Sequence, residues 1–210
     1  MKLKRILSGI QATGKLTLGN YLGAIDNWVH MQKEYDCYYM IANLHSLTVR
    51  NNPEELKNQQ INLLTVARLV PQKAIDRLIK VHSKLINDGV KHKLYVIGEG
   101  PEKNKLEQVI KQERCENTVQ LLGAKENPYP YMKKADYICL LSKFEGYGMV
   151  LEEAKILNKK ILITETAAKE AIENYSKGQV FENSEEGIYN GIKKVIQKEN
   201  SKEKDTQGIN

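Results

Sequence analysis

Residues 137–164 read YICLLSKFEGYGMVLEEAKILNKKILIT, and this stretch decides the fold class of the 210-residue chain. It opens with the apolar run 137–142, passes through a turn with two glycines into a helical segment over 148–158, and closes on the apolar run 160–164. Short, nearly continuous apolar runs are typical of parallel strands that are buried on both faces. The stretch therefore predicts two parallel strands joined by a helix.

The same alternation of apolar runs and helical segments fills most of the chain. Further strands are expected at 3–8, 37–42, 61–67, 93–98, 118–123 and 179–181. Further helices are expected at 19–34, 53–60, 72–88, 102–113, 127–136, 167–175 and 184–197. Strands that alternate with helices indicate an α/β fold, here a parallel sheet of Rossmann-like type covered on both faces and preceded by an N-terminal β-α-β segment.

Composition and charge exclude several classes of protein. The net charge of +6 arises from 32 basic and 26 acidic residues that are spread along the chain, without the clustered basic footprint of a nucleic-acid-binding protein. No apolar run approaches the roughly 18 residues of a membrane-spanning helix, and the apolar stretch at the N-terminus is too short for a signal peptide. The three cysteines have neither metal-binding nor disulfide spacing. We therefore expect a cytoplasmic protein.

The first glycine-rich stretch is SGIQATGKLTLGN, residues 8–20, between an expected strand and an expected helix. Its glycines would let the backbone approach phosphate groups, which the N-terminus of the next helix also attracts. Together with its surroundings over residues 1–64, this stretch resembles the N-terminal segment of bacterial tryptophanyl-tRNA synthetases, with residues 17–20 in place of the class I nucleotide-binding signature. The resemblance implies that ATP would be faced by Gln11, Lys15, Thr17, Gly19 and Asn20.

The remainder of the synthetase pattern is missing from this chain. No relative of the K-M-S-K-S loop occurs in residues 65–210, and Ala12 stands where the family usually has proline. Half of an ATP site cannot stabilise the charge that develops on the transferring phosphoryl group. We therefore expect no tryptophan activation.

Four ordered motifs follow in the rest of the chain. They are VARLVPQKAIDRLI (66–79), VIGEGPEK (96–103), LLGAKENPYPYMKKAD (121–136) and SKFEGYGMVLEEAKILNKKILIT (142–164). With these motifs, residues 61–197 resemble the donor-binding, C-terminal half of a family 4 glycosyltransferase of the GT-B type. Enzymes of this kind are retaining, and the similarity is greatest to those that build bacterial surface polysaccharides.

This second resemblance implies catalytic roles for Glu145, Arg68 and Lys73. Arg68 and Lys73 would neutralise the leaving nucleoside diphosphate beside a helix N-terminus, and Glu145 would contact hydroxyls of the donor sugar. Glu153 follows Glu145 after seven residues and would accept hydrogen bonds from the nucleotide ribose. The other implied nucleotide-binding residues are Gly98, Gly100, Gly146, Tyr147, Gly148, Met149 and Val150.

These residue types also have plainer explanations. The Gly98-x-Gly100 turn fits a generic strand-to-helix connection equally well, and two glutamates at this spacing are usually solvated charges. The family usually needs no metal, and the chain has no Asp-x-Asp motif, so no metal and no cofactor are expected. The implied ligand is a nucleotide sugar, with UDP as its nucleotide.

The two resemblances divide the chain into a synthetase-like segment over 1–60, a donor-binding domain over 61–197 and a flexible tail over 198–210. They overlap at INLL, residues 61–64, which we expect to begin a strand. Because the acceptor-binding domain of the GT-B type is missing, we expect little activity from this half alone. A lipid-linked acceptor at the inner membrane surface would be bound by that missing domain.

Three functions remain open at this point. The chain is the UDP-sugar-binding half of a retaining glycosyltransferase, a fragment of tryptophanyl-tRNA synthetase with an incomplete ATP and tryptophan site, or an inactive chimera. Binding of UDP rather than ATP distinguishes the first from the second, and binding of neither supports the third.

Overall fold

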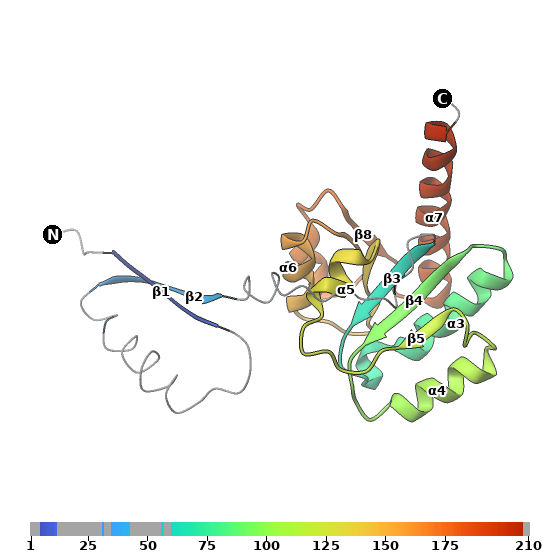
Figure 1. The fold of residues 1–210 in the computed structure, drawn as a ribbon, viewed down its shortest axis with the longest axis horizontal. Helices are drawn as coiled ribbons and strands as arrows, with labels where there is room; N and C mark the ends of the chain where they lie inside the picture. Colours follow the sequence, from blue (N-terminus) through green and yellow to red (C-terminus); the bar gives the residue numbers. More distant parts are fainter. Residues whose placement is uncertain (1–4, 12–30, 32–34, 43–55, 57–59, 208–210) are drawn as a thin grey trace. The chain divides into compact units, whose positions relative to one another are not determined.

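The structure is a computed structural model, which describes residues 5–11, 31, 35–42, 56 and 60–207 (Figure 1). The chain divides into two compact units, Met1–Asn51 and Asn52–Asn210. The described part of the first unit is a pair of parallel strands, β1 (Arg5–Gln11) and β2 (Asp36–Ala42), in register from Arg5 opposite Asp36 to Gln11 opposite Ala42.

This strand pair confirms the expected strand at 37–42 and corrects the first one. β1 does not end at residue 8 but continues to Gln11, because residues 8–11 extend the ladder with β2. The start of the glycine-rich stretch is therefore strand rather than loop. Almost all of the expected helices at 19–34 and 53–60 lies outside the described residues.

The second unit is built on a six-stranded, entirely parallel sheet with the strand order β5-β4-β3-β6-β7-β8. The strands are β3 (Ile61–Val66), β4 (His92–Ile97), β5 (Val119–Leu121), β6 (Tyr137–Leu140), β7 (Lys160–Thr164) and β8 (Gly178–Phe181). The overlap segment 61–64 is thus a strand, as expected. The chain fills the sheet outward from β3 to β5, then returns to β6 and proceeds outward to β8, so the strand order reverses between β3 and β6.

Helices cover both faces of this sheet (Figure 1). They are η3 (Pro71–Lys73), α3 (Ile75–Asn87), α4 (Lys103–Gln112), α5 (Tyr129–Lys134), α6 (Met149–Ile156), η4 (Ala167–Ile172) and α7 (Glu185–Gln207), of which η3 and η4 are 3-10 helices. α3 packs against α4 and α7, whereas α6 packs against η4. The expected α/β architecture is confirmed.

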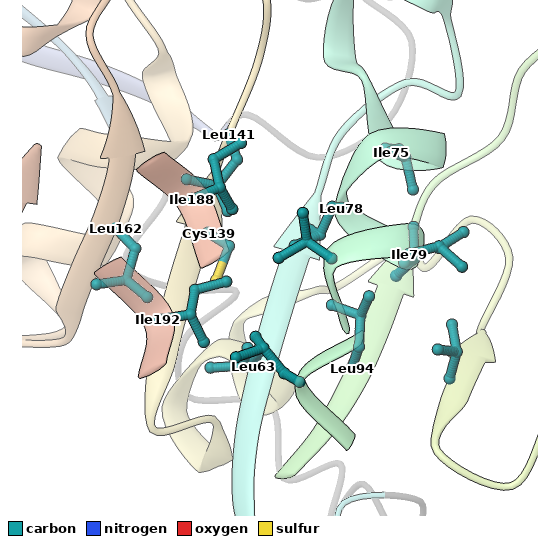
Figure 2. Close-up of a cluster of buried hydrophobic side chains, with 14 of the residues drawn as sticks. Leu63, Ile75, Leu78, Ile79, Leu94, Cys139, Leu141, Leu162, Ile188 and Ile192 are labelled. Atoms are coloured by element: carbon teal, nitrogen blue, oxygen red, sulfur yellow. The ribbon is translucent and has the colours of Figure 1, made fainter. Parts of the chain in front are cut away.

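Alternate residues of the strands supply the two layers of the core. Leu63 and Leu94 belong to the buried cluster beneath α3, α4 and α7, part of which Figure 2 shows together with Ile188 and Ile192 of α7. The next residue along β3, Leu64, is equally buried but lies outside that cluster. Because successive side chains of a strand point to opposite faces, the sheet is buried on both faces, which explains its continuous apolar runs.

A buried histidine pair joins α3 to β4. Nδ1 of His92 lies 2.8 Å from the carbonyl oxygen of Val90, Nε2 of His92 lies 2.9 Å from Nδ1 of His82, and Nε2 of His82 lies 2.9 Å from Oγ1 of Thr118. Since a carbonyl only accepts, neutral His92 donates from Nδ1 and accepts from His82. Burial lowers the pKa of His82 to about 3 and that of His92 to about 4. Both rings are therefore neutral near pH 7.

The C-terminal helix is longer than expected. α7 does not end near residue 197 but continues to Gln207, through most of the segment expected to be a flexible tail. Lys, Glu and Gln are good helix formers, and Oε2 of Glu199 lies 2.7 Å from Nζ of Lys160 at the start of β7. Within the described residues, no helix combines the length and the apolar character that crossing a membrane requires.

Candidate functional site

The candidate site lies at the carboxyl edge of the sheet, where the strand order reverses between β3 and β6. In open α/β sheets this edge is the usual place for ligands. Residues 67–70 lead from β3 into η3, and residues 141–148 lead from β6 into α6. Lys73, the last residue of η3, and Glu145, in the segment before α6, thus follow two neighbouring strands of the sheet.

Lys73 and Glu145 meet as an ion pair. Their side chains are 18% and 11% exposed, so the pair is mostly shielded from water. Oγ of Ser142 also donates a hydrogen bond of 3.2 Å to Oε2 of Glu145. The structure therefore brings together two of the three predicted catalytic residues, which stand 72 positions apart in the chain.

Arg68, the third of these residues, lies between β3 and η3 and its side chain is exposed. Among the described residues, no hydrogen bond or ion pair joins Arg68 to Lys73 or Glu145. Its position in the connection after β3 agrees with the prediction, but its role stays a prediction.

Gln72 ties the two connections to each other. Its Nε2 donates a hydrogen bond of 2.9 Å to the carbonyl oxygen of Phe144, and its own carbonyl accepts one of 2.9 Å from the backbone N–H of Lys143. Sequence reasoning missed this residue, although it precedes Lys73 in the motif. Its contacts fix η3 against the segment that carries Glu145.

The Gly98-x-Gly100 turn brings the chain after β4 against the chain after β3. Gly98 has a φ of +146°, and a Cβ atom there would lie 1.8 Å from the carbonyl oxygen of Ala67. A Cβ atom on Gly100 would lie 2.3 Å from the carbonyl oxygen of Leu69. Both glycines are therefore required for close backbone packing beside η3, whatever they contribute to a ligand.

The turn before α6 presents backbone and exposed apolar groups at the same edge. α6 begins at Met149 after Gly148, and no side chain caps its N-terminus. The first N–H groups of a helix have no partner within the helix, so this end attracts anions. Phe144, Tyr147 and Met149 are 72%, 63% and 66% exposed around it. The predicted residues Gly146 and Val150 belong to this same turn and helix start.

Glu153 lies one turn further along α6 and is half-buried. Oη of Tyr129, at the start of α5, donates a hydrogen bond of 3.0 Å to Oε1 of Glu153. Burial raises the pKa of Glu153, and the hydrogen bond from Tyr129 opposes that rise. Its neighbour Glu152 instead pairs with Lys155 at 2.7 Å, which lowers the pKa of Glu152.

The predicted ATP-facing residues lie almost entirely outside the described part of the chain, so their roles stay predictions. Gln11 is the last residue of β1, and its side chain is not described; Thr17, Gly19 and Asn20 lie outside the described residues. In the described ranges, no three His, Cys, Asp or Glu side chains gather in a way that could hold a metal ion.

Part of the chain is similar to tryptophan–tRNA ligases. The ligase of Rickettsia conorii is 49% identical over 88 residues, which cover 39% of this chain but only 27% of the ligase. This similarity agrees with the resemblance that the motifs of residues 1–64 carry. The chain thus spans about a quarter of that relative.

Solved structures with a similar fold are glycosyltransferases. TarM of S. aureus, in a complex that includes UDP and α-GlcNAc-glycerol, aligns with a TM-score of 0.62 at 20% identity, over 90% of this chain and 37% of TarM. WaaG, a glycosyltransferase involved in lipopolysaccharide biosynthesis, aligns with a TM-score of 0.63 at 21% identity, over 81% of this chain and 51% of WaaG. At these identities the likeness shows the fold, which is that of the GT-B type.

A family assignment follows from the longest match. Residues 49–208 match the family described as glycosyl transferases group 1. That range includes all six strands of the parallel sheet, the Lys73–Glu145 pair and the start of α6. The chain therefore belongs to the group 1 glycosyltransferase family, and part of it is also similar to tryptophan–tRNA ligase.

Proposed function

We propose that the chain binds a nucleotide sugar, with UDP as its nucleotide, as the donor-binding half of a retaining family 4 glycosyltransferase. The observation that carries the proposal is the meeting of Lys73 and Glu145 where the strand order reverses, beside the uncapped start of α6. A cation and a helix N-terminus suit a diphosphate, and a carboxylate can accept hydrogen bonds from sugar hydroxyls.

The diphosphate would lie between Lys73 and the first turn of α6. Backbone N–H groups there supply hydrogen bonds and the positive end of the helix dipole. Lys73 is held by Glu145 and mostly shielded from water, so a diphosphate would gain a charged donor that is already ordered. Arg68, which is exposed, would add a second cation from the neighbouring connection.

The carboxylates of Glu145 and Glu153 would accept hydrogen bonds from hydroxyl groups of the ligand. Glu145 would accept hydrogen bonds from the donor sugar, with its carboxylate oriented by Lys73 and Ser142. Glu153 would accept the ribose hydroxyls, because Tyr129 holds Oε1 in place and a carboxylate has several lone pairs to offer. Neither carboxylate needs to act as a nucleophile in this arrangement.

The acceptor side of the reaction lies beyond these residues. The chain spans 37% of TarM and 51% of WaaG, so the activity of a whole transferase is a proposal for this chain. By analogy with WaaG, we propose a bacterial surface polysaccharide as the product and a lipid-linked acceptor reached at the inner face of the membrane. The donor half alone would then turn over little.

A second candidate function rests on the similarity to tryptophan–tRNA ligase. That similarity favours an ATP-binding segment at the N-terminus, with Gln11, Thr17 and Asn20 toward the nucleotide. It covers 27% of the ligase, so the segment would bind ATP weakly and would not activate tryptophan. An inactive chimera is the remaining alternative, and it predicts that neither nucleotide binds.

Variants at the site test the proposed roles by calorimetric titration with UDP. Replacing Lys73 or Glu153 by Ala removes a charged hydrogen-bonding group worth about 1.5 kcal/mol, so each change should weaken UDP binding about tenfold. Glu145→Gln should weaken UDP-glucose more than UDP, since the proposed contact is to the sugar.

Glu116→Ala is the matched control, because Glu116 is an exposed glutamate that precedes β5, at the edge of the sheet opposite the candidate site. Its affinity for UDP should equal that of the unmodified chain. Equal UDP affinity in Lys73→Ala, Glu153→Ala and the control would contradict the proposed site.

A further inference from the structure

The segment that carries Glu145 is held through the carbonyl oxygens of its backbone. Five consecutive carbonyl oxygens, those of residues 141–145, each accept a hydrogen bond from a different element of the second unit. The donors, in order, are Arg77 Nη2 of α3 at 2.9 Å, Thr164 Oγ1 of β7 at 2.6 Å, Asn183 Nδ2 before α7 at 2.9 Å, Gln72 Nε2 of η3 at 2.9 Å and Ala168 N of η4 at 3.2 Å.

Asn183 holds the central position among these donors. Its Oδ1 accepts a hydrogen bond of 2.8 Å from Nη2 of Arg77, and its Nδ2 donates to the carbonyl oxygen of Lys143. Because a guanidinium group only donates, the amide oxygen must face Arg77 and the amide nitrogen must face Lys143. The orientation of the Asn183 amide is therefore fixed by its partners.

Arg77 supports the same segment from α3, where it is half-buried. Its Nη2 donates both to the carbonyl oxygen of Leu141 and to Asn183. Burial lowers the pKa of Arg77, and the charges of Glu185 and Asp76 oppose that shift. Burying a charged group is costly unless the group is hydrogen-bonded. Arg77 meets this requirement by donating to the carbonyl oxygen of Leu141, before Glu145, and to the side-chain amide of Asn183.

We infer that Asn183, oriented by Arg77, is a positioning residue that holds residues 141–145 in the conformation in which Glu145 meets the donor sugar. This inference rests on the proposed function of Glu145. A segment fixed at every carbonyl has little conformational freedom left to lose when a ligand binds, so its binding groups are pre-organised. Asn183 itself lies 38 positions after Glu145 and acts on the sugar only through that segment.

Asn183→Asp is the sharpest variant. The carboxylate keeps an acceptor for Arg77 but faces the carbonyl oxygen of Lys143 with an oxygen instead of a donor. We expect the affinity for UDP-glucose and UDP-N-acetylglucosamine to fall about tenfold, as for one lost hydrogen bond, and that for UDP to fall less than threefold. Asn190→Asp, an exposed site on α7, is the control and should change neither affinity.

A double variant separates positioning from a merely structural role. If Asn183 acts through Glu145, then Asn183→Asp in a Glu145→Gln background should weaken the sugar nucleotides by less than twofold, because the sugar contact is already lost. A tenfold loss in that background as well would overturn the inference, as would unchanged UDP-glucose affinity in the single variant.

A second variant guards against failure of Asn183→Asp to fold. Gln72→Ala alters an exposed residue and likewise removes the donor to the next carbonyl oxygen, that of Phe144, without adding a charge beside Lys73. It should lower UDP-glucose affinity in the same selective way, whereas Gln108→Ala on the exposed side of α4 should not. Equal affinities in the two glutamine variants would count against the inference.

Hydrogen exchange distinguishes failure of the inference from failure of the proposed function. The amide of Lys143 donates to the carbonyl oxygen of Gln72, so its exchange reports how firmly the segment is held. Exchange at least tenfold faster in Asn183→Asp than in Asn190→Asp supports the positioning role without any ligand, and equal exchange overturns it. Absence of UDP binding by the unmodified chain would instead refute the proposed function.

Discussion

The two units of the chain contain different sheets. The described residues of the first unit include the parallel pair β1 and β2, and the second unit contains the six-stranded parallel sheet with helices on both faces. The chain also has two similarities of different kinds: 49% identity to the ligase of Rickettsia conorii over 39% of the chain, and 20% identity to TarM over 90% of the chain. A high identity over a short stretch and a shared fold over most of the chain are therefore separate observations, and each needs its own test.

The test with the largest expected effect separates the two units and asks whether the second folds and binds UDP without the first. A chain of residues 52–210 should keep the cooperative thermal unfolding and the UDP affinity of the full chain, because the six-stranded sheet and its helices are intact. Loss of folding or of UDP binding in the 52–210 chain would show that the second unit depends on the first.

The buried pair His82 and His92 should make the free energy of unfolding of the second unit depend on pH. Both rings are neutral when folded, with pKa values of about 3 for His82 and about 4 for His92, whereas an unfolded histidine has a pKa of about 6.5. Below pH 6.5 the unfolded state therefore takes up protons that the folded state does not, and stability falls as the pH decreases toward 4. At pH 5 the loss should be about 2 kcal/mol for each histidine.

Urea unfolding at pH 7 and pH 5 measures this loss. The double variant His82→Gln, His92→Gln, compared at the same two values, should lose about 4 kcal/mol less between them than the unmodified chain. The same difference should appear in the 52–210 chain. A double variant with an unchanged pH dependence would show that other groups are responsible.

Gly98 tests the turn that packs the chain after β4 against the chain after β3. Gly98→Ala should cost about 3 kcal/mol, because the new Cβ would overlap the carbonyl oxygen of Ala67 and φ is +146°. Gly146→Ala is the control, since a Cβ there meets nothing within 4 Å, and its change should stay within about 0.5 kcal/mol. Similar free energies of unfolding for the two variants would contradict the packing role of Gly98.

The smallest expected effect is a gain in stability. Arg114 follows α4 in the left-handed conformation, with a φ of 52°, and its side chain is exposed. Glycine adopts this conformation without strain, so Arg114→Gly should stabilise the chain by about 1 kcal/mol. Glu116→Gly, two residues further on at an exposed position of ordinary φ, should not stabilise it. Denaturant unfolding of both variants checks the difference, and a loss of stability in Arg114→Gly would refute the expectation.

Sequence patterns predicted the sheet because parallel strands buried on both faces leave apolar runs that periodicity reveals. The family resemblance named Lys73 and Glu145 as site residues with separate roles, and their meeting as an ion pair is a finding of the structure. The end of β1 at Gln11 was missed because residues 8–11 contain a glycine that is typical of a loop, and only the pairing with β2 makes them a strand.

The residues that hold the site were beyond sequence reasoning for a different reason. Gln72, Arg77 and Asn183 donate from side chains to backbone carbonyl oxygens, and such bonds follow neither the helix nor the strand period. The extension of α7 was missed although Lys, Glu and Gln favour a helix, because a polar, charge-balanced composition is also typical of disorder; the ion pair between Glu199 and Lys160 is visible only in the fold. Contacts between remote positions with no repeating pattern become visible only in the fold.

The most direct test of the central claim is a side-by-side calorimetric titration of the full chain with UDP and with ATP. The donor site in the second unit predicts heat of binding with UDP and a dissociation constant below one millimolar. This limit corresponds to a binding free energy of about −4 kcal/mol, and tighter binding gives a more negative value. It predicts clearly weaker binding of ATP. No heat from millimolar UDP, with the sheet and helices confirmed by circular dichroism, would contradict the account, and so would binding of ATP tighter than that of UDP.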